Sequence, residues 1–129
     1  MTPMVTHRGA CHCGAVALEV EAPAVIRALE CNCSICRATG YQHLIVPRER
    51  MRLLRGEEVL VEYRFGTETA RHLFCGRCGI KPFYVPRSHP HGYSVNVRCL
   101  DPTTIERVEL ELFDDGDREA ATRRFADLA

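Results

Sequence analysis

Apolar and polar residues alternate along much of this chain, and the alternation predicts β-strands. Val16, Leu18 and Val20 are apolar, whereas Glu19 and Glu21 carry charges on the opposite face of the same stretch. A period of two is typical of a strand with one face buried in the core. Other alternating or apolar stretches predict strands at residues 26–29, 43–46, 71–74, 80–85, 93–99 and 108–112. These short strands predict a mostly β protein built of antiparallel sheets.

One glycine between two predicted strands indicates how these strands are connected. Residues 51–54 and 59–65 flank a turn at Gly56, and this arrangement favours a β-hairpin. No repeat, linker or low-complexity segment interrupts the pattern. Residues 1–129 are therefore expected to form a single domain.

Two segments have helical character. Ser34 is a suitable cap for a short helical turn that ends at Gly40. Residues 114–129 form a polar, helix-like tail. The sequence thus predicts short helical turns and a C-terminal helical tail around the sheets.

The composition is that of an ordinary globular domain and excludes several functions. The chain has 129 residues, of which 46% are hydrophobic and 26% charged, enough for a sizeable core. The 17 basic residues equal the 17 acidic ones, so no net charge favours binding to nucleic acid or to an anionic membrane. Residues 1–8 lack the apolar run of a signal peptide, and no later stretch is long enough to span a bilayer. We therefore expect a cytoplasmic protein without a membrane or nucleic-acid partner.

The eight cysteines carry the clearest chemical signal. In a reducing compartment they are better explained as metal ligands or reactive thiols than as disulfides. Cys31, Cys33 and Cys36, the cysteine trio, place three thiols within a six-residue stretch. Zinc–thiolate bonds of about 2.3 Å put tetrahedral ligands only ~3.8 Å apart, a separation that such short loops allow. Three protein ligands leave the fourth position open, as in catalytic zinc sites.

Two further pairs of cysteines lie far from the trio in the sequence. Cys11 and Cys13 precede it, whereas Cys75 and Cys78 follow it in a glycine-rich knuckle. Together these outer four cysteines would form a closed shell around a structural zinc ion, which contributes to folding. Spacing alone leaves other pairings of the clusters open.

Three other residues with reactive side chains are expected to have structural roles. Cys99 is in phase with an apolar strand face, so we place it in the core, with a fourth ligand or resolving thiol as the alternative. His43 and His72 lie in predicted strands. There, core or hydrogen-bonding roles are favoured over metal binding or proton transfer.

Four ordered motifs span about residues 6–105: GACHCGAV from residue 9, CNCSIC from residue 31, HLFCGRCG from residue 72 and NVRCLD from residue 96. Together they resemble the glutathione-dependent formaldehyde-activating enzyme (Gfa)/CENP-V family. The resemblance implies a zinc-containing fold of the β-tent type with two zinc ions per chain. It further implies that the outer four cysteines hold the structural zinc and that the trio holds the catalytic one.

The resemblance also implies an activity. Founding members of the family condense glutathione with formaldehyde to S-hydroxymethylglutathione. The resemblance therefore predicts that this protein is a zinc-dependent carbon–sulfur lyase or condensing enzyme. The expected partner is a small-molecule thiol, with glutathione as possible co-substrate. A thiol held at the open zinc position would stay ionised near neutral pH, and the thiolate is the nucleophile that attacks a small carbonyl. Glutathione has two carboxylates, and we expect its contacts to come from Arg37, Tyr41 and Arg87.

Two alternatives to catalysis remain open at this point. The first is a non-catalytic, zinc-stabilised binding module, as the name of the chromosome-associated branch of the resembled family suggests. The second is a thiol redox protein that uses the trio to release zinc on oxidation.

Overall fold

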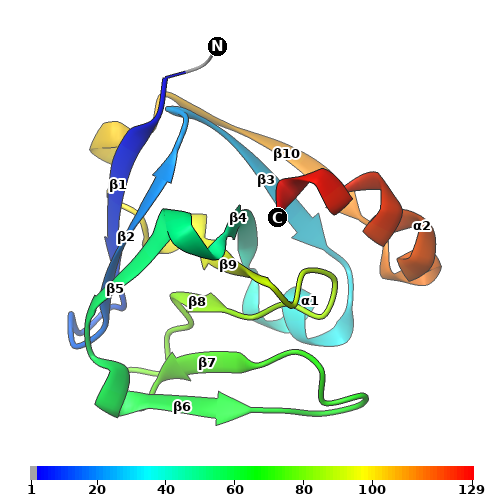
Figure 1. Cartoon of the computed structure of the whole chain (residues 1–129). Coiled ribbons are helices and arrows are strands. Elements are labelled where there is room, and N and C mark those ends of the chain that lie inside the picture. The colour runs from blue at the N-terminus through cyan, green and yellow to red at the C-terminus, as the bar shows by residue number, and fades with distance from the viewer. Residues whose placement is uncertain (1–2) are drawn as a thin grey trace.

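The structure, a computed structural model, describes residues 3–129 and is mostly β (Figure 1). Its strands are β1 (Val5–Ala10), β2 (Ala17–Ala22), β3 (Val25–Cys31), β4 (Gln42–Pro47), β5 (Met51–Arg55), β6 (Leu60–Tyr63), β7 (His72–Cys75), β8 (Phe83–Tyr84), β9 (Gly92–Asn96) and β10 (Arg107–Phe113). The α-helices are α1 (Ser34–Thr39) and α2 (Arg118–Arg124). Short 3-10 helices cover Arg48–Arg50, Glu57–Val59, Val97–Cys99, Pro102–Thr104, Asp115–Asp117 and Ala126–Leu128. A mostly β fold with short helical turns and a C-terminal helical tail is thus confirmed.

The strands form three sheets, with the orders β1-β2-β5, β10-β3-β4-β9-β8 and β6-β7. Every pair is antiparallel except β3 with β10, which run parallel. The expectation of purely antiparallel sheets is therefore wrong at this edge. Residues 97–106 carry the chain back to the end of the sheet where β3 begins, so that Arg107 pairs with Val25. A strand that enters from that end can only run parallel to its neighbour.

The predicted hairpin between residues 51–54 and 59–65 does not form. Instead, β5 pairs with β2, and β6 pairs with β7 (Figure 1). Gly56 separates the two strands with a φ of +96°, and a Cβ atom there would come within 2.3 Å of the carbonyl oxygen of Ala15. This glycine turn directs the chain out of the first sheet rather than back along it. Strand β6 then pairs with β7 in a separate two-stranded sheet, the two-stranded arm.

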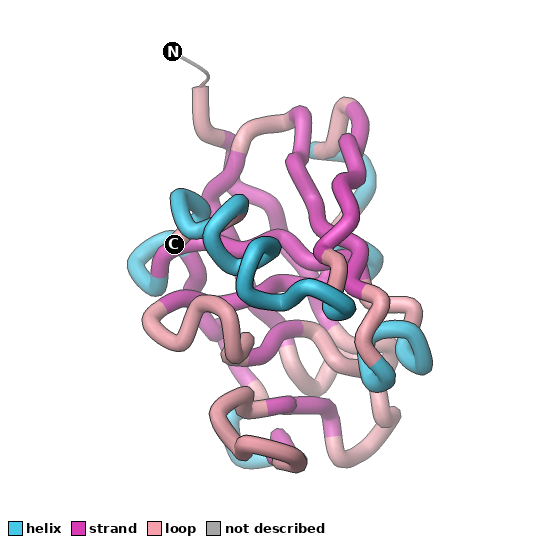
Figure 2. The backbone as a smooth tube through the Cα atoms, turned by 90° about the vertical axis from the view of Figure 1, so that its right-hand side faces the viewer, coloured by secondary structure: helices cyan, strands magenta, loops and turns pink. Residues whose placement is uncertain are grey.

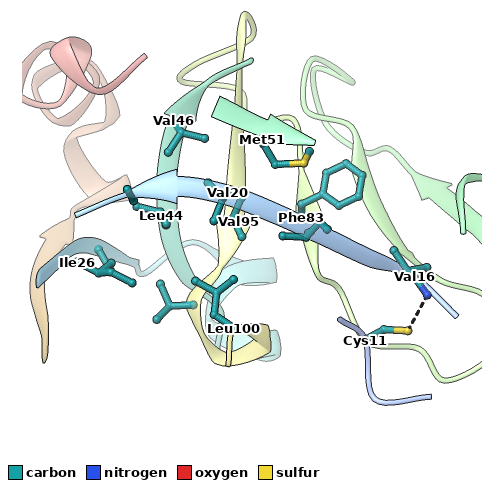
Figure 3. Packing of buried hydrophobic residues seen from close by; sticks show 14 of the residues in the cluster. Cys11, Val16, Val20, Ile26, Leu44, Val46, Met51, Phe83, Val95 and Leu100 are labelled. Carbon is teal, nitrogen blue, oxygen red and sulfur yellow. Dashed lines mark hydrogen bonds between the residues drawn. The ribbon is translucent and has the colours of Figure 1, made fainter. Parts of the chain in front are cut away.

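The main core lies between the first two sheets (Figure 3). Val16, Leu18 and Val20 of the first predicted strand are fully buried there. Leu44 of β4 packs in the same cluster. The core extends to the first cysteine, because the backbone N–H of Val16 donates a hydrogen bond to the Sγ of Cys11 at 3.3 Å. The packing of the sheets therefore places the sulfur atom of Cys11 directly.

The polar tail has a packing role that its sequence did not reveal. Phe125, at the end of α2, is fully buried and packs with Leu29, Ile45 and Phe113 in a second apolar cluster. Figure 2, viewed from the side of α2, shows this helix lying over the strands. No helix within residues 3–129 is long and apolar enough to cross a membrane.

Candidate metal centres and the adjoining cavity

The outer four cysteines converge from two distant parts of the chain. Cys11 and Cys13 lie in the turn after β1, whereas Cys75 ends β7 and Cys78 lies in the turn that follows. Their sulfur atoms all lie within 4.8 Å of one another, with 3.6 Å between Cys11 and Cys13. These separations fit the ~3.8 Å expected for thiolates around one tetrahedral zinc ion. The donor set fits a closed structural site.

The knuckle after β7 directs backbone amides toward its first sulfur. The N–H of Arg77 donates to the Sγ of Cys75 at 3.4 Å. Hydrogen bonds from the backbone N–H groups of Cys78 and Arg77 lower the pKa of Cys75. Gly79, with a φ of +78°, closes the turn by donating its N–H to the carbonyl of Cys75 at 2.8 Å. The knuckle therefore favours the thiolate form that a metal requires.

The cysteine trio forms the second group. Cys31 ends β3, Cys33 caps the N-terminus of α1 and Cys36 lies within that helix. The three sulfur atoms lie within 4.8 Å of one another, and no fourth histidine, cysteine or carboxylate of residues 3–129 joins the group. Hydrogen bonding with Cys36 lowers the pKa of Cys31 to about 6, so a thiolate forms readily here. The donor set fits a zinc ion with three protein ligands and an open fourth position.

A cavity of about 170 Å³ adjoins the trio, and all three cysteines contribute to its wall. Aromatic and charged residues complete the wall, including Phe65, His43, His72, Tyr84, Arg87 and Arg118. The guanidinium of Arg118 is paired with the carboxylate of Asp115 at 2.6 Å, whereas Arg87 is exposed. A metal ion held by these three cysteines would adjoin a space that can admit a substrate.

A buried polar cluster forms part of this wall and continues behind it; it consists of Tyr41, His43, His72, Lys81, Tyr84 and Ser94. The Nδ1 of His43 lies 2.9 Å from the Oγ of Ser94 and 3.2 Å from the hydroxyl of Tyr84. Burial lowers the pKa of His43 to about 3, so the imidazole is neutral. Both hydroxyl groups can donate to Nδ1 or accept from Nδ1–H, so these contacts are satisfied with the ring proton on either nitrogen. Among the residues described, Nε2 of His43 is the buried side-chain nitrogen left without a partner.

Lys81 is the second unusual member of the cluster. Its Nζ lies 2.7 Å from the Nδ1 of His72 and 3.7 Å from the centroid of the Tyr84 ring. Only 8% of the residue is exposed, and within residues 3–129 no carboxylate pairs with it. Burial lowers the pKa of Lys81 to about 8, and burial together with the nearby ammonium lowers the pKa of His72 to about 4. The amine of Lys81 and the imidazole of His72 therefore both have pKa values well below their ordinary ones.

The three predicted glutathione contacts have different surroundings. Arg87 lines the cavity. Arg37 is exposed on α1, and Tyr41 is buried with its hydroxyl donating to the carbonyl of Ser94 at 2.7 Å. Neither belongs to the cavity wall. Arg118 lines the cavity wall. The sequence did not indicate this, because the charges of residues 114–129 are balanced as in any solvated helix.

Sequence reasoning also missed the buried polar cluster as a unit. His43 and His72 are buried and hydrogen-bonded, in agreement with the structural roles expected for them, but both also line the cavity. Lys81 carried a signal that was overlooked: it is the single lysine among 17 basic residues. A chain that otherwise uses arginine has one amine that can lose its proton, and that amine is buried beside the cavity wall.

Cys99 lies outside both sulfur groups. The strand predicted to reach residue 99 ends at Asn96, whose side chain accepts a hydrogen bond from the N–H of Arg98 and begins a 3-10 turn. Cys99 is therefore half-buried as the last residue of that turn rather than in phase on a strand. Burial raises its pKa to about 11, so it is a poor nucleophile.

The fold and its cysteines define a class: a small β protein with a group of four cysteines and a group of three cysteines on a cavity wall, each of which could hold a metal ion. Residues 6–115 match the family described as glutathione-dependent formaldehyde-activating enzyme. The chain belongs to this family, which its sequence motifs resemble. The structure is also similar to the crystal structure of a Rhodobacter sphaeroides protein solved as a structural genomics target. The two are 41% identical, with a TM-score of 0.69, over 81% of this chain and 99% of that chain.

Proposed function

We propose that this protein is a zinc-dependent carbon–sulfur lyase that condenses a glutathione-like thiol with a small aldehyde, or cleaves the adduct. The observation that carries the proposal is the group of three sulfur atoms on the wall of a cavity, which no fourth histidine, cysteine or carboxylate of residues 3–129 joins; a zinc ion held there would keep one position for a substrate. A fully enclosed ion would leave no place for a substrate thiol. The family description supports glutathione and formaldehyde as the substrate pair.

The chain supplies binding groups around the reacting atoms. When bound, zinc would hold a thiol in its ionised, nucleophilic form. Cys31, Cys33 and Cys36 would hold the ion. His43 lines the cavity, and its buried Nε2 has no hydrogen-bond partner among the residues described; in the Nε2–H tautomer it would donate a hydrogen bond to a carbonyl oxygen placed beside it, as negative charge develops there. Because this imidazole is neutral, it stabilises the oxygen without adding a fixed charge.

The rest of the thiol substrate requires cationic contacts. Arg87 lines the cavity, and within residues 3–129 it has no ion-pair partner. We propose it as the first contact for a glutathione carboxylate, with Arg37 and Tyr41 as more distant candidates. All eight cysteines are free thiols, which supports a reducing compartment such as the cytoplasm.

The test combines zinc content with turnover. Wild-type protein, Cys33→Ser and the control Cys99→Ser are purified, and zinc per chain and condensation of glutathione with formaldehyde are measured. We expect two zinc ions in the wild type, one in Cys33→Ser with at least a 100-fold loss of activity, and wild-type behaviour for Cys99→Ser. Full turnover by Cys33→Ser with a single zinc would overturn the proposal.

A further inference from the structure

The amine of Lys81 is buried without a carboxylate, and the single hydrogen-bond partner of its Nζ within residues 3–129 is His72. An ammonium in such surroundings loses hydration that a carboxylate would normally replace. The ring of Tyr84, 3.7 Å from Nζ, replaces only part of that hydration through its π-electrons. The site therefore tolerates both the charged and the neutral amine, which an arginine could not provide.

His72 connects this amine with the cavity. Its Nδ1 contacts the Nζ of Lys81 at 2.7 Å, and its ring lines the same cavity as the cysteine trio. Lys81 itself does not belong to the wall. A proton can therefore pass between Lys81 and the cavity through the imidazole. The ring is held in place by stacking on Tyr84, with centroids 5.0 Å apart and planes inclined by 14°.

The charged form of Lys81 requires one tautomer of His72, whereas the neutral form also permits the other. A charged amine has no lone pair, so it donates to Nδ1 and the imidazole carries its hydrogen on Nε2. A neutral amine can instead accept from Nδ1–H, which leaves the lone pair on Nε2 of a ring that lines the cavity. The same 2.7 Å contact serves both arrangements. The pair thus changes between a proton donor and a proton acceptor without moving its heavy atoms.

We propose that Lys81 and His72 form a proton relay that takes the proton of the substrate thiol and returns it to the aldehyde oxygen. The inference rests on the proposed function and adds the acid–base groups to it. In the first step the thiol proton passes to Nε2 of His72, and the hydrogen on Nδ1 passes to neutral Lys81. In the second step the C–S bond forms and the carbonyl π bond breaks. The oxygen then takes the hydrogen from Nε2 while Lys81 returns a proton to Nδ1.

This cycle is balanced and needs no further reactant. One thiol and one aldehyde give one hydroxyalkyl thioether, and Lys81 ends in the neutral form in which it began. The reverse sequence cleaves the adduct. His72 passes the proton without storing it, because its lowered pKa disfavours the imidazolium form.

The groups that face Lys81 are consistent with storage of a proton on the amine. Aromatic rings of Tyr41 and Tyr84 and the imidazoles of His43 and His72 surround it, and the thiols of the trio supply the nearby negative charge. Burial lowers the pKa of Lys81 to about 8, and the thiolates oppose this effect. The amine therefore exchanges its proton near neutral pH.

The first experiment needs no turnover and uses the zinc-loaded protein. Because Lys81 is the only lysine, ¹³C-labelled lysine gives one side-chain signal, and ¹⁵N-labelled histidine reports the tautomer of His72 in the same titration. We expect the lysine to titrate near pH 8 and His72 to change from the Nε2–H to the Nδ1–H tautomer with the same midpoint. A lysine that stays charged to pH 10, or a tautomer that does not follow it, would overturn the relay.

The second experiment separates the relay from a purely structural cation. Lys81→Arg keeps a charge over the Tyr84 ring but cannot release a proton, and Lys81→Met removes both. We expect both variants to retain two zinc ions and a KM for glutathione within twofold, while kcat falls at least 100-fold. Arg50→Gln, which removes an exposed cation, should leave kcat unchanged. Near-normal kcat in Lys81→Arg would overturn the relay, whereas a wild type without turnover and with the expected titration would overturn the substrate assignment alone.

Discussion

The sulfur atoms of Cys13 and Cys75 lie 3.7 Å apart, although 62 residues separate them in the sequence. This contact joins the turn after β1 to the knuckle after β7. In doing so it connects the first sheet with the two-stranded arm, two units that share no strand pairing. A metal held at this point would therefore link two sheets that make no strand hydrogen bonds with each other.

Replacement of Cys13 by serine is expected to unfold much of the domain. A structural zinc site contributes on the order of 10 kcal/mol in small zinc domains, comparable to the whole stability of a typical protein. Zinc content should fall below one structural ion per chain, and circular dichroism should show loss of strand signal. The control is Cys99→Ser, which alters a thiol outside both groups. A Cys13→Ser protein with wild-type thermal stability would contradict a structural role for this site.

Strand positions were largely predictable from the sequence, whereas strand partners were not. The alternation of Val16, Leu18 and Val20 requires one buried face, and that face is buried. The partner of β5, in contrast, depends on Gly56, where crowding against the backbone at Ala15 turns the chain away from its neighbour. A contact between segments far apart in the sequence produces no periodic pattern of apolar residues from which it could be predicted.

Removal of the aromatic ring of Phe125 should detach the C-terminal helix. The ring is fully buried against Phe113, with centroids 6.2 Å apart. Phe125→Ala should therefore lower the free energy of unfolding by about 3–5 kcal/mol. Urea denaturation measures this loss, with Leu112→Ala as the control because that side chain is 53% exposed and should change stability by about 0.5 kcal/mol or less. Equal effects of the two substitutions would show that the tail does not contribute to the core.

The sulfur ligands of the candidate site were also predictable, because cysteine spacing limits the geometry of a tetrahedral ion. The buried polar cluster was not. Lys81, His72 and His43 come from three separate segments and meet only in the folded chain. Individually, each has the sequence environment of an ordinary strand or turn residue.

Arg87 offers a direct test of thiol recognition. It lines the cavity, so Arg87→Ala should raise the KM for glutathione about fivefold to tenfold while kcat stays within twofold. Arg37→Ala provides the matched control, since Arg37 is an exposed arginine outside the cavity wall. Steady-state kinetics at varied glutathione concentration give both constants. A larger KM effect for Arg37 than for Arg87 would place the substrate carboxylates over α1 instead.

The neutral imidazole of His43 should make stability depend on pH. Its pKa is lowered to about 3 by burial, whereas an unfolded histidine titrates near 6.5. Between these values the unfolded chain binds a proton that the folded chain excludes. The contribution of neutral His43 is therefore complete above about pH 6.5 and is lost as the pH falls toward 3, by about 1.4 kcal/mol per pH unit.

Comparison with His43→Gln isolates this effect from the other titrating groups. His72 and the cysteines titrate in both proteins, so acid-induced loss of zinc and protonation of His72 affect both curves alike. Between pH 6 and 5 the free energy of unfolding of the wild type should fall more steeply than that of His43→Gln by about 1 kcal/mol. Urea denaturation at a series of pH values measures the two slopes. Parallel curves would mean that His43 is protonated in the folded protein, and such a cation would bind the developing oxyanion as a charge partner rather than as a neutral donor.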